Sequence, residues 1–337
     1  MRLLVLGGSA FLGRAVVDAA VERGWEVTTF NRGQSRNAHP RVECLRGDRL
    51  DPDSLTPLRT REWDAVVDTW SGIPRAVRDS AAALSGRVGH YGYVSSRSVY
   101  RPPLAVGADE TAPVVASSPD AEDGSYAEMK AGGELAAQAA FGDQALCARA
   151  GLVIGPYEDV GRLPWWLLRA SRGGPMLAPG PPELLLQYID ARDLASWLLD
   201  CAQRRIGGAF NVVSAQGHAT MQQLLSSCVD VTGHVAELVW VRPEQVLAHG
   251  VEPWNDLPVW IPPGHPYSEL GLHTGDVTKA YQTGLQPRPI EETVADTWAW
   301  LREVDGAAPQ RDDRSPVGLS AETEAAILAS ASPFTTG

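Results

Sequence analysis

Short apolar runs alternate with longer amphipathic stretches through the first half of the chain. The apolar runs predict strands at residues 3–6, 25–30, 42–45, 65–69 and 91–95. A helical period predicts helices at residues 11–23, 75–84 and 126–140. Strands that alternate with helices are typical of a parallel sheet covered on both faces. The sequence therefore predicts an α/β fold with a doubly wound, Rossmann-type sheet.

The second half of the chain is less regular. It is rich in proline and holds eight of the eleven tryptophans. Such a composition suits a smaller lobe that covers a substrate, and it equally suits a loop-rich packing core. We expect a dinucleotide-binding domain at residues 1–155, a substrate-binding lobe at residues 156–305 of which about 185–215 return to the sheet, and a flexible tail at residues 306–337 with a short helix near 321–331.

Composition narrows the class of protein. The formal net charge is −12 and no basic block is present, which disfavours a nucleic-acid partner. No apolar run reaches the roughly 18 residues of a membrane span, and the apolar N-terminus leads into glycines rather than a cleavage site. The four scattered cysteines predict neither a disulfide framework nor a metal site. We expect a cytoplasmic protein that acts on a small molecule.

The stretch "LGGSAFLGR" follows the first predicted strand and opens the first predicted helix. A dinucleotide fingerprint places glycines three residues apart along such a turn. Gly7 and Gly13 occupy the outer positions, and Ala10 replaces the middle glycine. The helix start still offers N–H groups to a phosphate. A cofactor site and an ordinary tight turn both fit these residues.

Asn31 and Arg32 follow at the end of the second predicted strand. A dehydrogenase that uses NAD carries an acid here for the ribose hydroxyls, whereas an amide beside a guanidinium accommodates the 2′-phosphate of NADP. The pair therefore favours NADP(H) over NAD(H), with Arg14 as a further cation, unless both are solvated turn residues. Asp48, after the third predicted strand, can accept from an adenine amino group or cap a turn.

Tyr126 and Lys130 lie four residues apart on one face of a predicted helix. Only two of the 29 basic residues are lysines, Lys130 and Lys279, so chance is a poor explanation for this spacing. A nearby ammonium favours the phenolate form and lets a phenol exchange a proton at neutral pH. Ser95 and Ser96 end the fifth predicted strand, where open α/β sheets place their ligands, and a hydroxyl there can hold a substrate oxygen.

These segments together resemble the extended short-chain dehydrogenase/reductase family, which includes nucleotide-sugar epimerases and dehydratases. The motifs "GGSAFLG", "GDRLD", "SSRSVY" and "YAEMK" carry the resemblance, and the N-terminal stretch looks like an isoflavone-reductase-like or stem-loop-binding-like subgroup. The resemblance implies a catalytic trio of Ser96, Tyr126 and Lys130, with Lys130 on the nicotinamide ribose. It implies a cofactor bound by Gly7, Ser9, Ala10, Phe11, Leu12, Gly13, Asn31, Arg32, Asp48, Arg49, Thr69, Trp70, Tyr126 and Lys130.

Some residues depart from the family pattern. Sugar dehydratases carry an Asp-Glu pair directly after the catalytic hydroxyl, and Arg97 and Ser98 stand there in this chain, so dehydration is not expected. Trp70 replaces a small residue near the nicotinamide, where it either narrows the pocket or fills core. The residues placed at the substrate by analogy are Arg97, Ser98, Pro156, Trp165, Trp166 and Tyr188.

Three functions fit these features. The leading one is an NAD(P)H-dependent reductase or dehydrogenase that transfers hydride at a carbonyl or similar group of a small organic molecule. The alternatives are a nucleotide-sugar epimerase with tightly bound NAD and a redox-silent nucleotide- or RNA-binding protein. The Tyr–Lys pair argues against redox silence, and the net charge argues against RNA. Relatives often pair through two helices of the nucleotide domain, so the resemblance also suggests a homodimer.

Overall fold

The computed structural model describes residues 1–33, 39–311 and 315–331, which form two compact units. Unit 1 comprises Met1–Gly151, Ala191–Val213 and Gly275–Gln286, and unit 2 comprises Leu152–Asp190, Ser214–Thr274 and Pro287–Gly337. Two segments of the second half therefore belong to unit 1. A return to the sheet was expected over residues 185–215, whereas the contribution of Gly275–Gln286 was not predicted.

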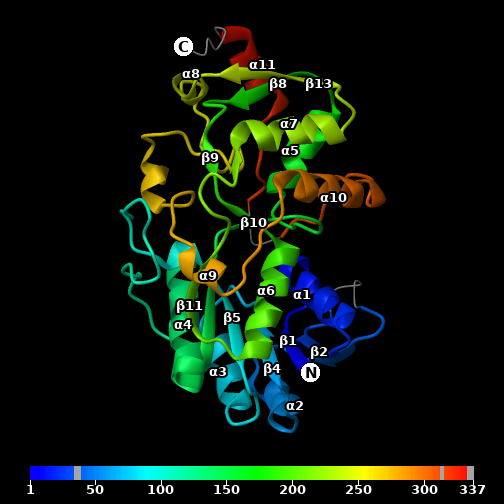
Figure 1. Cartoon of the computed structure of the whole chain (residues 1–337), viewed down its shortest axis with the longest axis vertical. Helices are drawn as coiled ribbons and strands as arrows, with labels where there is room; N and C mark the ends of the chain where they lie inside the picture. Colours follow the sequence, from blue (N-terminus) through cyan, green and yellow to red (C-terminus); the bar gives the residue numbers. More distant parts are fainter. Residues whose placement is uncertain (34–38, 312–314, 332–337) are drawn as a thin grey trace. The chain divides into compact units, whose positions relative to one another are not determined.

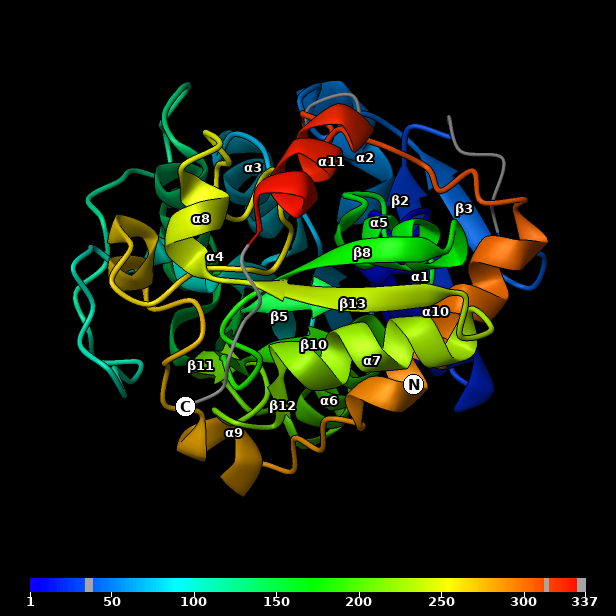
Figure 2. The ribbon, with the colours of Figure 1, turned by 90° about the horizontal axis from the view of Figure 1, so that it is seen from above.

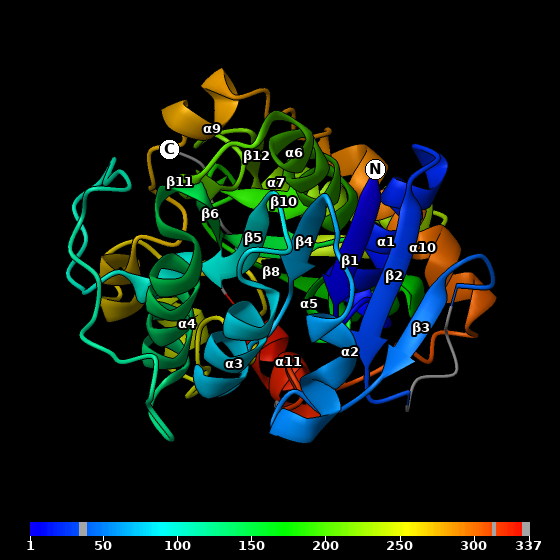
Figure 3. The ribbon, with the colours of Figure 1, turned by 90° about the horizontal axis from the view of Figure 1, so that it is seen from below.

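Unit 1 is built on a parallel sheet that has seven strands within the described residues. The strands are β1 (Arg2–Leu6), β2 (Glu26–Asn31), β3 (Glu43–Arg46), β4 (Ala65–Asp68), β5 (Tyr91–Ser96), β6 (Ala145–Ala150) and β11 (Gly208–Val212). Their order is β11-β6-β5-β4-β1-β2-β3, and every neighbouring pair is parallel (Figure 3). The order changes direction at β1, which confirms the predicted doubly wound, Rossmann-type sheet.

Helices cover the sheet of unit 1. α1 (Phe11–Glu22) packs against α6 (Ala191–Arg204), and α3 (Arg75–Leu84) packs against α4 (Tyr126–Phe141), as Figure 1 shows. The central strands are buried along nearly their whole length because both faces of the sheet are covered. The remaining helical elements of this unit are short: η1 (Pro52–Leu55), α2 (Thr56–Arg59), η2 (Arg97–Val99), η3 (Gly142–Gln144) and α9 (Thr278–Gln282).

Unit 2 combines three short strand pairs with helices. The strands are β7 (Leu152–Ile154) with β10 (Tyr188–Asp190), β8 (Gly174–Pro179) with β13 (Ala236–Val241), and β9 (Leu185–Leu186) with β12 (Ala219–Thr220). The helices are α5 (Arg162–Ser171), α7 (Met221–Val231), α8 (Pro243–Leu247), η4 (Pro266–Leu270), α10 (Ile290–Glu303) and α11 (Ala321–Ser330). Figure 2 shows β8 and β13 lying side by side and parallel. No helix in the described part of the chain is long and apolar enough to cross a bilayer.

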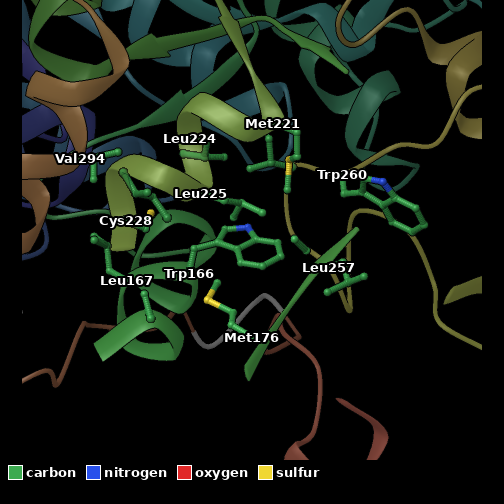
Figure 4. Close-up of a cluster of buried hydrophobic side chains, with 14 of the residues drawn as sticks. Trp166, Leu167, Met176, Met221, Leu224, Leu225, Cys228, Leu257, Trp260 and Val294 are labelled. Atoms are coloured by element: carbon green, nitrogen blue, oxygen red, sulfur yellow. The ribbon is translucent and has the colours of Figure 1, made fainter. Parts of the chain in front are cut away.

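Tryptophans fill the core of unit 2. Trp166 and Trp260 are fully buried among apolar side chains such as Met176 and Leu225 (Figure 4). Each indole N–H donates to a backbone carbonyl, that of Trp166 at 2.9 Å and that of Trp260 at 2.9 Å. A large ring can be buried at little cost only when its polar atom has such a partner. The aromatic richness of the second half is therefore explained in part by packing.

α11 lies in the segment that was predicted to be a flexible tail. Ile327 of this helix is fully buried in the core of unit 2, and Glu324 accepts hydrogen bonds from Arg169 at 2.6 Å and from the Leu177 N–H at 3.0 Å. The predicted helix is thus held to the core of unit 2 by a buried ion pair, rather than belonging to a loose tail. Residues 312–314 and 332–337 of the predicted tail lie outside the described residues.

A second buried ion pair holds α4 against the sheet of unit 1. Arg149 of β6 donates to Glu134 of α4 through Nε at 2.9 Å and through Nη2 at 2.8 Å. The Ser95 hydroxyl of β5 donates to the same carboxylate at 2.6 Å. Both charged side chains are more than nine-tenths buried. One carboxylate therefore connects α4 to two neighbouring strands.

Replacing Arg149 with methionine tests this connection. The variant leaves the Glu134 carboxylate buried without its guanidinium, and we expect the free energy of unfolding to fall by about 3–5 kcal/mol. Urea titration followed by circular dichroism measures the loss. The control is Arg61→Met, which breaks the exposed pair between Arg61 and Glu43 and should cost far less. Equal losses in the two variants would contradict the assignment.

Candidate functional site

A tight glycine turn joins β1 to α1. Gly7 has a φ of +120°, and a Cβ at this position would collide with Oγ1 of Thr69, which follows β4. Oγ1 of Thr69 also donates to the Leu6 carbonyl at 3.0 Å. A Cβ on Gly13 would lie 2.7 Å from the Gly8 nitrogen, so the first turn of α1 packs directly on the turn backbone. Both glycines are therefore required by close approach, as the fingerprint predicts.

The alanine at position 10 leaves the start of α1 intact. Ala10 is the exposed N-cap residue of α1, and its own side chain makes no capping hydrogen bond. Phe11, Leu12 and Gly13 form the first turn. Backbone N–H groups of a first helical turn, together with the helix dipole, favour an anion. Because the Ala10 methyl is exposed, it does not disturb the packing of the turn.

A pocket of about 330 Å³ opens at the carboxyl ends of four neighbouring strands, β4, β1, β2 and β3. Its lining comprises Leu6, Gly7, Ser9, Phe30, Asn31, Arg32, Gly33, Gly47, Asp48, Arg49, Thr69, Trp70 and Ser71. Ligands of open α/β sheets bind at this edge, where the strand order changes direction. The glycine turn and the pocket together fit the adenosine diphosphate part of a dinucleotide. Eight of the predicted cofactor residues line the pocket: Gly7, Ser9, Asn31, Arg32, Asp48, Arg49, Thr69 and Trp70.

Asn31 and Arg49 already hold other parts of unit 1. The Asn31 amide donates to the Gly7 carbonyl at 3.2 Å and accepts from the Gly33 N–H at 2.8 Å, so it braces the glycine turn. Arg49 donates to both carboxylate oxygens of Asp68, at 2.6 and 2.7 Å, and is nearly fully buried. Burial lowers the pKa of Arg49, but the Asp68 carboxylate together with Tyr91 and Tyr93 outweighs burial, and the net shift is upward. The guanidinium of Arg49 is therefore already held by Asp68 and forms part of the pocket wall.

Trp70 is fixed beside this ion pair. Its indole N–H donates to the Ile73 carbonyl at 2.9 Å, and its backbone N–H donates to Asp68 at 3.0 Å. The Arg49 guanidinium lies 5.1 Å from the ring centroid, within cation–π range. The indole lines the pocket and also contacts the core of unit 1. Trp70 therefore fills core, as one of the two sequence interpretations has it, and its predicted effect on the nicotinamide site stays a prediction.

Lys130 lies buried in the second turn of α4. Its ammonium donates to the Trp70 carbonyl at 2.6 Å and to the Val94 carbonyl of β5 at 2.7 Å. It also lies 4.9 Å from the centroid of the Tyr93 ring. The side chain is 3% exposed, so the positive charge is held inside the fold next to the pocket residue Trp70. An arginine fork would not fit so compact a site.

Tyr126 begins α4, one helical turn before Lys130. Ser125 caps the helix in a reciprocal capping box with Glu128, which fixes where the helix starts and hence where Tyr126 stands. Tyr126 is 38% exposed. The neighbouring Tyr93 is fully buried, and burial, with the charges of Asp68, Tyr126 and Glu134, raises its pKa well above the usual value. Of these two phenols, Tyr126 is the one that a ligand can reach.

The two serines at the end of β5 have different partners. Ser95 donates to the buried Glu134 carboxylate at 2.6 Å and is part of the helix–sheet connection. The Ser96 hydroxyl donates to the Ser98 hydroxyl at 3.1 Å and accepts from the Ser98 N–H at 3.1 Å. A hydroxyl that donates to another hydroxyl can rotate toward a ligand at low cost. These contacts favour Ser96 over Ser95 as the ligand-facing serine.

The predicted substrate residues belong to two units and differ in burial. Arg97 is 3% exposed, its guanidinium packs against Gly275 within unit 1, and burial lowers its pKa. Trp166 is fully buried in the core of unit 2, and Tyr188 is 1% exposed with its hydroxyl bonded to the Arg288 carbonyl at 2.9 Å. These two aromatic residues are therefore core residues, a correction to the sequence prediction. They pack inside unit 2 because their polar atoms find backbone partners there.

The other three have partly exposed side chains. Ser98 is tied to Ser96, as described above. Trp165 packs edge-to-face on Trp166 and also lies against Gly318. Pro156 is half-buried in the loop after β7. Ser98 belongs to unit 1, whereas Pro156 and Trp165 belong to unit 2.

The sequence did not reveal Glu134 and Arg149. Glu134 follows Lys130 by four residues, so Tyr126, Lys130 and Glu134 share one face of α4. That spacing is visible in "YAEMKAGGE" and is the signal that could have pointed to Glu134. Arg149 carries no comparable local signal, because its partners come from α4 and from the loop that contains Glu110.

Comparison with solved structures supports the fold. The Bordetella bronchiseptica enzyme WbmH, in complex with NAD+, aligns with a TM-score of 0.66 at 18% identity, over 90% of this chain and 98% of that chain. The UDP-glucose 4-epimerase of Thermus thermophilus, in complex with NAD, aligns with a TM-score of 0.63 at 19% identity, over 90% of this chain and 99% of that chain. At these identities the likeness shows a shared architecture.

Comparison of the sequence with known proteins shows the family. A 3 beta-hydroxysteroid dehydrogenase/Delta 5→4-isomerase of Mycobacterium tuberculosis is 43% identical over 53 residues, which is 15% of this chain and 14% of that protein's length. The model of the NAD dependent epimerase/dehydratase family matches residues 3–213, more than half of the chain. This chain therefore belongs to the NAD dependent epimerase/dehydratase family, in agreement with its resemblance to the extended short-chain dehydrogenases/reductases.

Proposed function

We propose that this chain is an NADP(H)-dependent oxidoreductase that exchanges hydride at a carbonyl or similar group of a small organic molecule. Ser96, Tyr126 and Lys130 are its reacting-centre residues. The observation that carries the proposal is the buried ammonium of Lys130, one helical turn from the exposed phenol of Tyr126 and bonded to carbonyls at the ligand-binding edge of the sheet. A buried cation one helical turn from a reachable phenol suits proton exchange.

Each of the three side chains has a separate task. A bound nicotinamide cofactor supplies hydride to the substrate carbon or accepts it. Tyr126 donates its phenolic proton to the carbonyl oxygen, which becomes the alcohol oxygen, and it takes that proton back in the reverse direction. Ser96 donates a hydrogen bond to the same oxygen. The Lys130 ammonium stabilises the phenolate that remains on Tyr126.

The end of β2 supports NADP(H) over NAD(H). The strand ends in the neutral Asn31, whose amide braces the glycine turn, and continues into the exposed Arg32 of the pocket lining. A carboxylate at this position would repel a 2′-phosphate, whereas a guanidinium attracts it. Among the cations near the turn, Arg14 lies 3.5 Å from Asp18 along α1. Arg32 is therefore the better-placed cation.

A nucleotide-sugar epimerase with a retained cofactor is the second candidate. The match to the epimerase/dehydratase family favours it, as does the structural likeness to a UDP-glucose 4-epimerase. The same three residues suit it, because an epimerase oxidises and re-reduces one carbon with a cofactor that stays bound. A net reductase instead exchanges its cofactor in every turnover.

Cofactor retention separates these two candidates. We expect the purified chain, once denatured, to release far less than one dinucleotide per chain, because a reductase must let its cofactor dissociate. Chromatography of the supernatant of the denatured protein measures the amount of dinucleotide released per chain, with added NAD as a recovery standard. Stoichiometric NAD would favour the epimerase and contradict the reductase.

Replacing Tyr126 with phenylalanine removes the proposed proton donor. We expect the rate of NADPH oxidation with a carbonyl compound, found by screening a panel, to fall by about 10²–10⁴-fold, the usual contribution of a positioned general acid. NADPH affinity, measured by fluorescence, should change little. The matched control is Tyr281→Phe, because Tyr281 is 37% exposed and belongs to the same unit. Full activity of the Tyr126 variant would contradict the assigned role.

The two lysines allow a second matched comparison. Lys130→Met removes the buried ammonium, and we expect loss of turnover with NADPH binding about tenfold weaker, as the loss of one charge-assisted hydrogen bond predicts. Lys279 donates to the Ala209 carbonyl at 2.6 Å and lies over the Phe210 ring. Lys279→Met should therefore lower stability and leave turnover intact. Equal turnover in the two variants would remove Lys130 from the reacting centre.

A further inference from the structure

Arg46 ends β3 beside the pocket, although it is not part of the pocket lining. In the register of the sheet it pairs with Asn31, and the next residue, Gly47, donates its N–H to the Asn31 carbonyl at 3.0 Å. The side chain of Arg46 is exposed. The carboxyl ends of β2 and β3 thus place Arg32 and Arg46 at neighbouring positions on one edge of the sheet.

The Arg46 side chain extends across Gly33. A Cβ built on Gly33 would lie 2.9 Å from Nε of Arg46 and 3.1 Å from its Cδ. Gly33 itself lines the pocket and directly follows Arg32. The missing side chain at Gly33 therefore leaves room for the Arg46 side chain next to the pocket wall.

The charges around Arg46 leave its guanidinium suited to an external anion. Glu43, three residues earlier on β3, accepts from Arg61 at 2.6 Å. Asp48, two residues later, accepts from the Leu50 N–H at 2.9 Å and stays in its own turn. Asp48 is the acid of the pocket lining, so the anion must bind at the Arg32–Gly33 end rather than beside Asp48.

We propose that Arg46 is a second specificity residue for the cofactor, which together with Arg32 binds the 2′-phosphate of NADP(H). A phosphate dianion offers three oxygens, and two guanidinium groups at the ends of neighbouring strands can each bind it through paired N–H groups. The sequence pointed only to Arg32. Arg46 comes beside the Arg32–Gly33 segment only through the pairing of β3 with β2, which the sequence does not show. The inference rests on the proposed preference for NADP(H).

The test uses the full chain and two soluble probes, 2′,5′-ADP and 5′-ADP, which differ by the 2′-phosphate. The variants Arg46→Met and Arg32→Met are compared with Arg87→Met. Arg87 is exposed and precedes β5, at the opposite end of the strands, so the control removes one positive charge away from the pocket. Calorimetric titration at two salt concentrations gives each dissociation constant.

We expect Arg46→Met to weaken 2′,5′-ADP binding by about tenfold or more, as the loss of a charge-assisted contact predicts. Binding of 5′-ADP should change less than about twofold, and Arg87→Met should leave both probes unchanged. An Arg46 variant that behaves like the Arg87 variant, while Arg32→Met loses the preference, overturns the role of Arg46 alone. A wild-type chain that binds both probes equally overturns the NADP(H) preference itself.

Discussion

The buried ion pair between Glu134 and Arg149 sets the geometry on which the candidate site of unit 1 depends. Its carboxylate belongs to α4, its guanidinium belongs to β6, and Ser95 of β5 donates to the same carboxylate. Separating two such buried charges is costly, so α4 cannot slide along the sheet. Lys130 lies one turn before Glu134 on α4, and Ser96 follows Ser95 on β5. The same contact therefore sets the position of the helix residues relative to the serine.

The two lysines of this arginine-rich chain make similar contacts but are assigned different roles. Lys130 and Lys279 each donate to backbone carbonyls and lie near an aromatic ring. A compact ammonium fits the buried place of Lys130, where a planar guanidinium would need more room, whereas Lys279 is exposed. A retained lysine by itself therefore does not identify a reacting centre. What distinguishes Lys130 is its location, one helical turn from Tyr126 at the ligand-binding edge of the sheet. This location is the reason to assign Lys130 to the proposed reacting centre.

Much of the fold of unit 1 was predictable because its signals are local. The helical period predicted residues 75–84, and α3 covers Arg75–Leu84. The strand pairs of unit 2 have no such signal: β8 pairs with β13, about sixty residues later, and the pairing becomes visible only in space. The same holds for α11, whose predicted helix forms but whose docking depends on Arg169 of α5. The repeat of hydrophobic positions identifies a helix or strand, whereas contacts with residues distant in the sequence decide where it packs.

The sequence by itself determined the sheet type, the glycine turn and the Tyr126–Lys130 pair, because each depends on residue types at fixed spacings along the chain. Only the tertiary structure decided which polar side chains are already engaged. Asn31 braces the turn, Arg49 pairs with Asp68, and the Trp166 indole donates within the core of unit 2. The physical reason is that a buried polar group must find a partner, and these partners come from distant segments that no local pattern specifies.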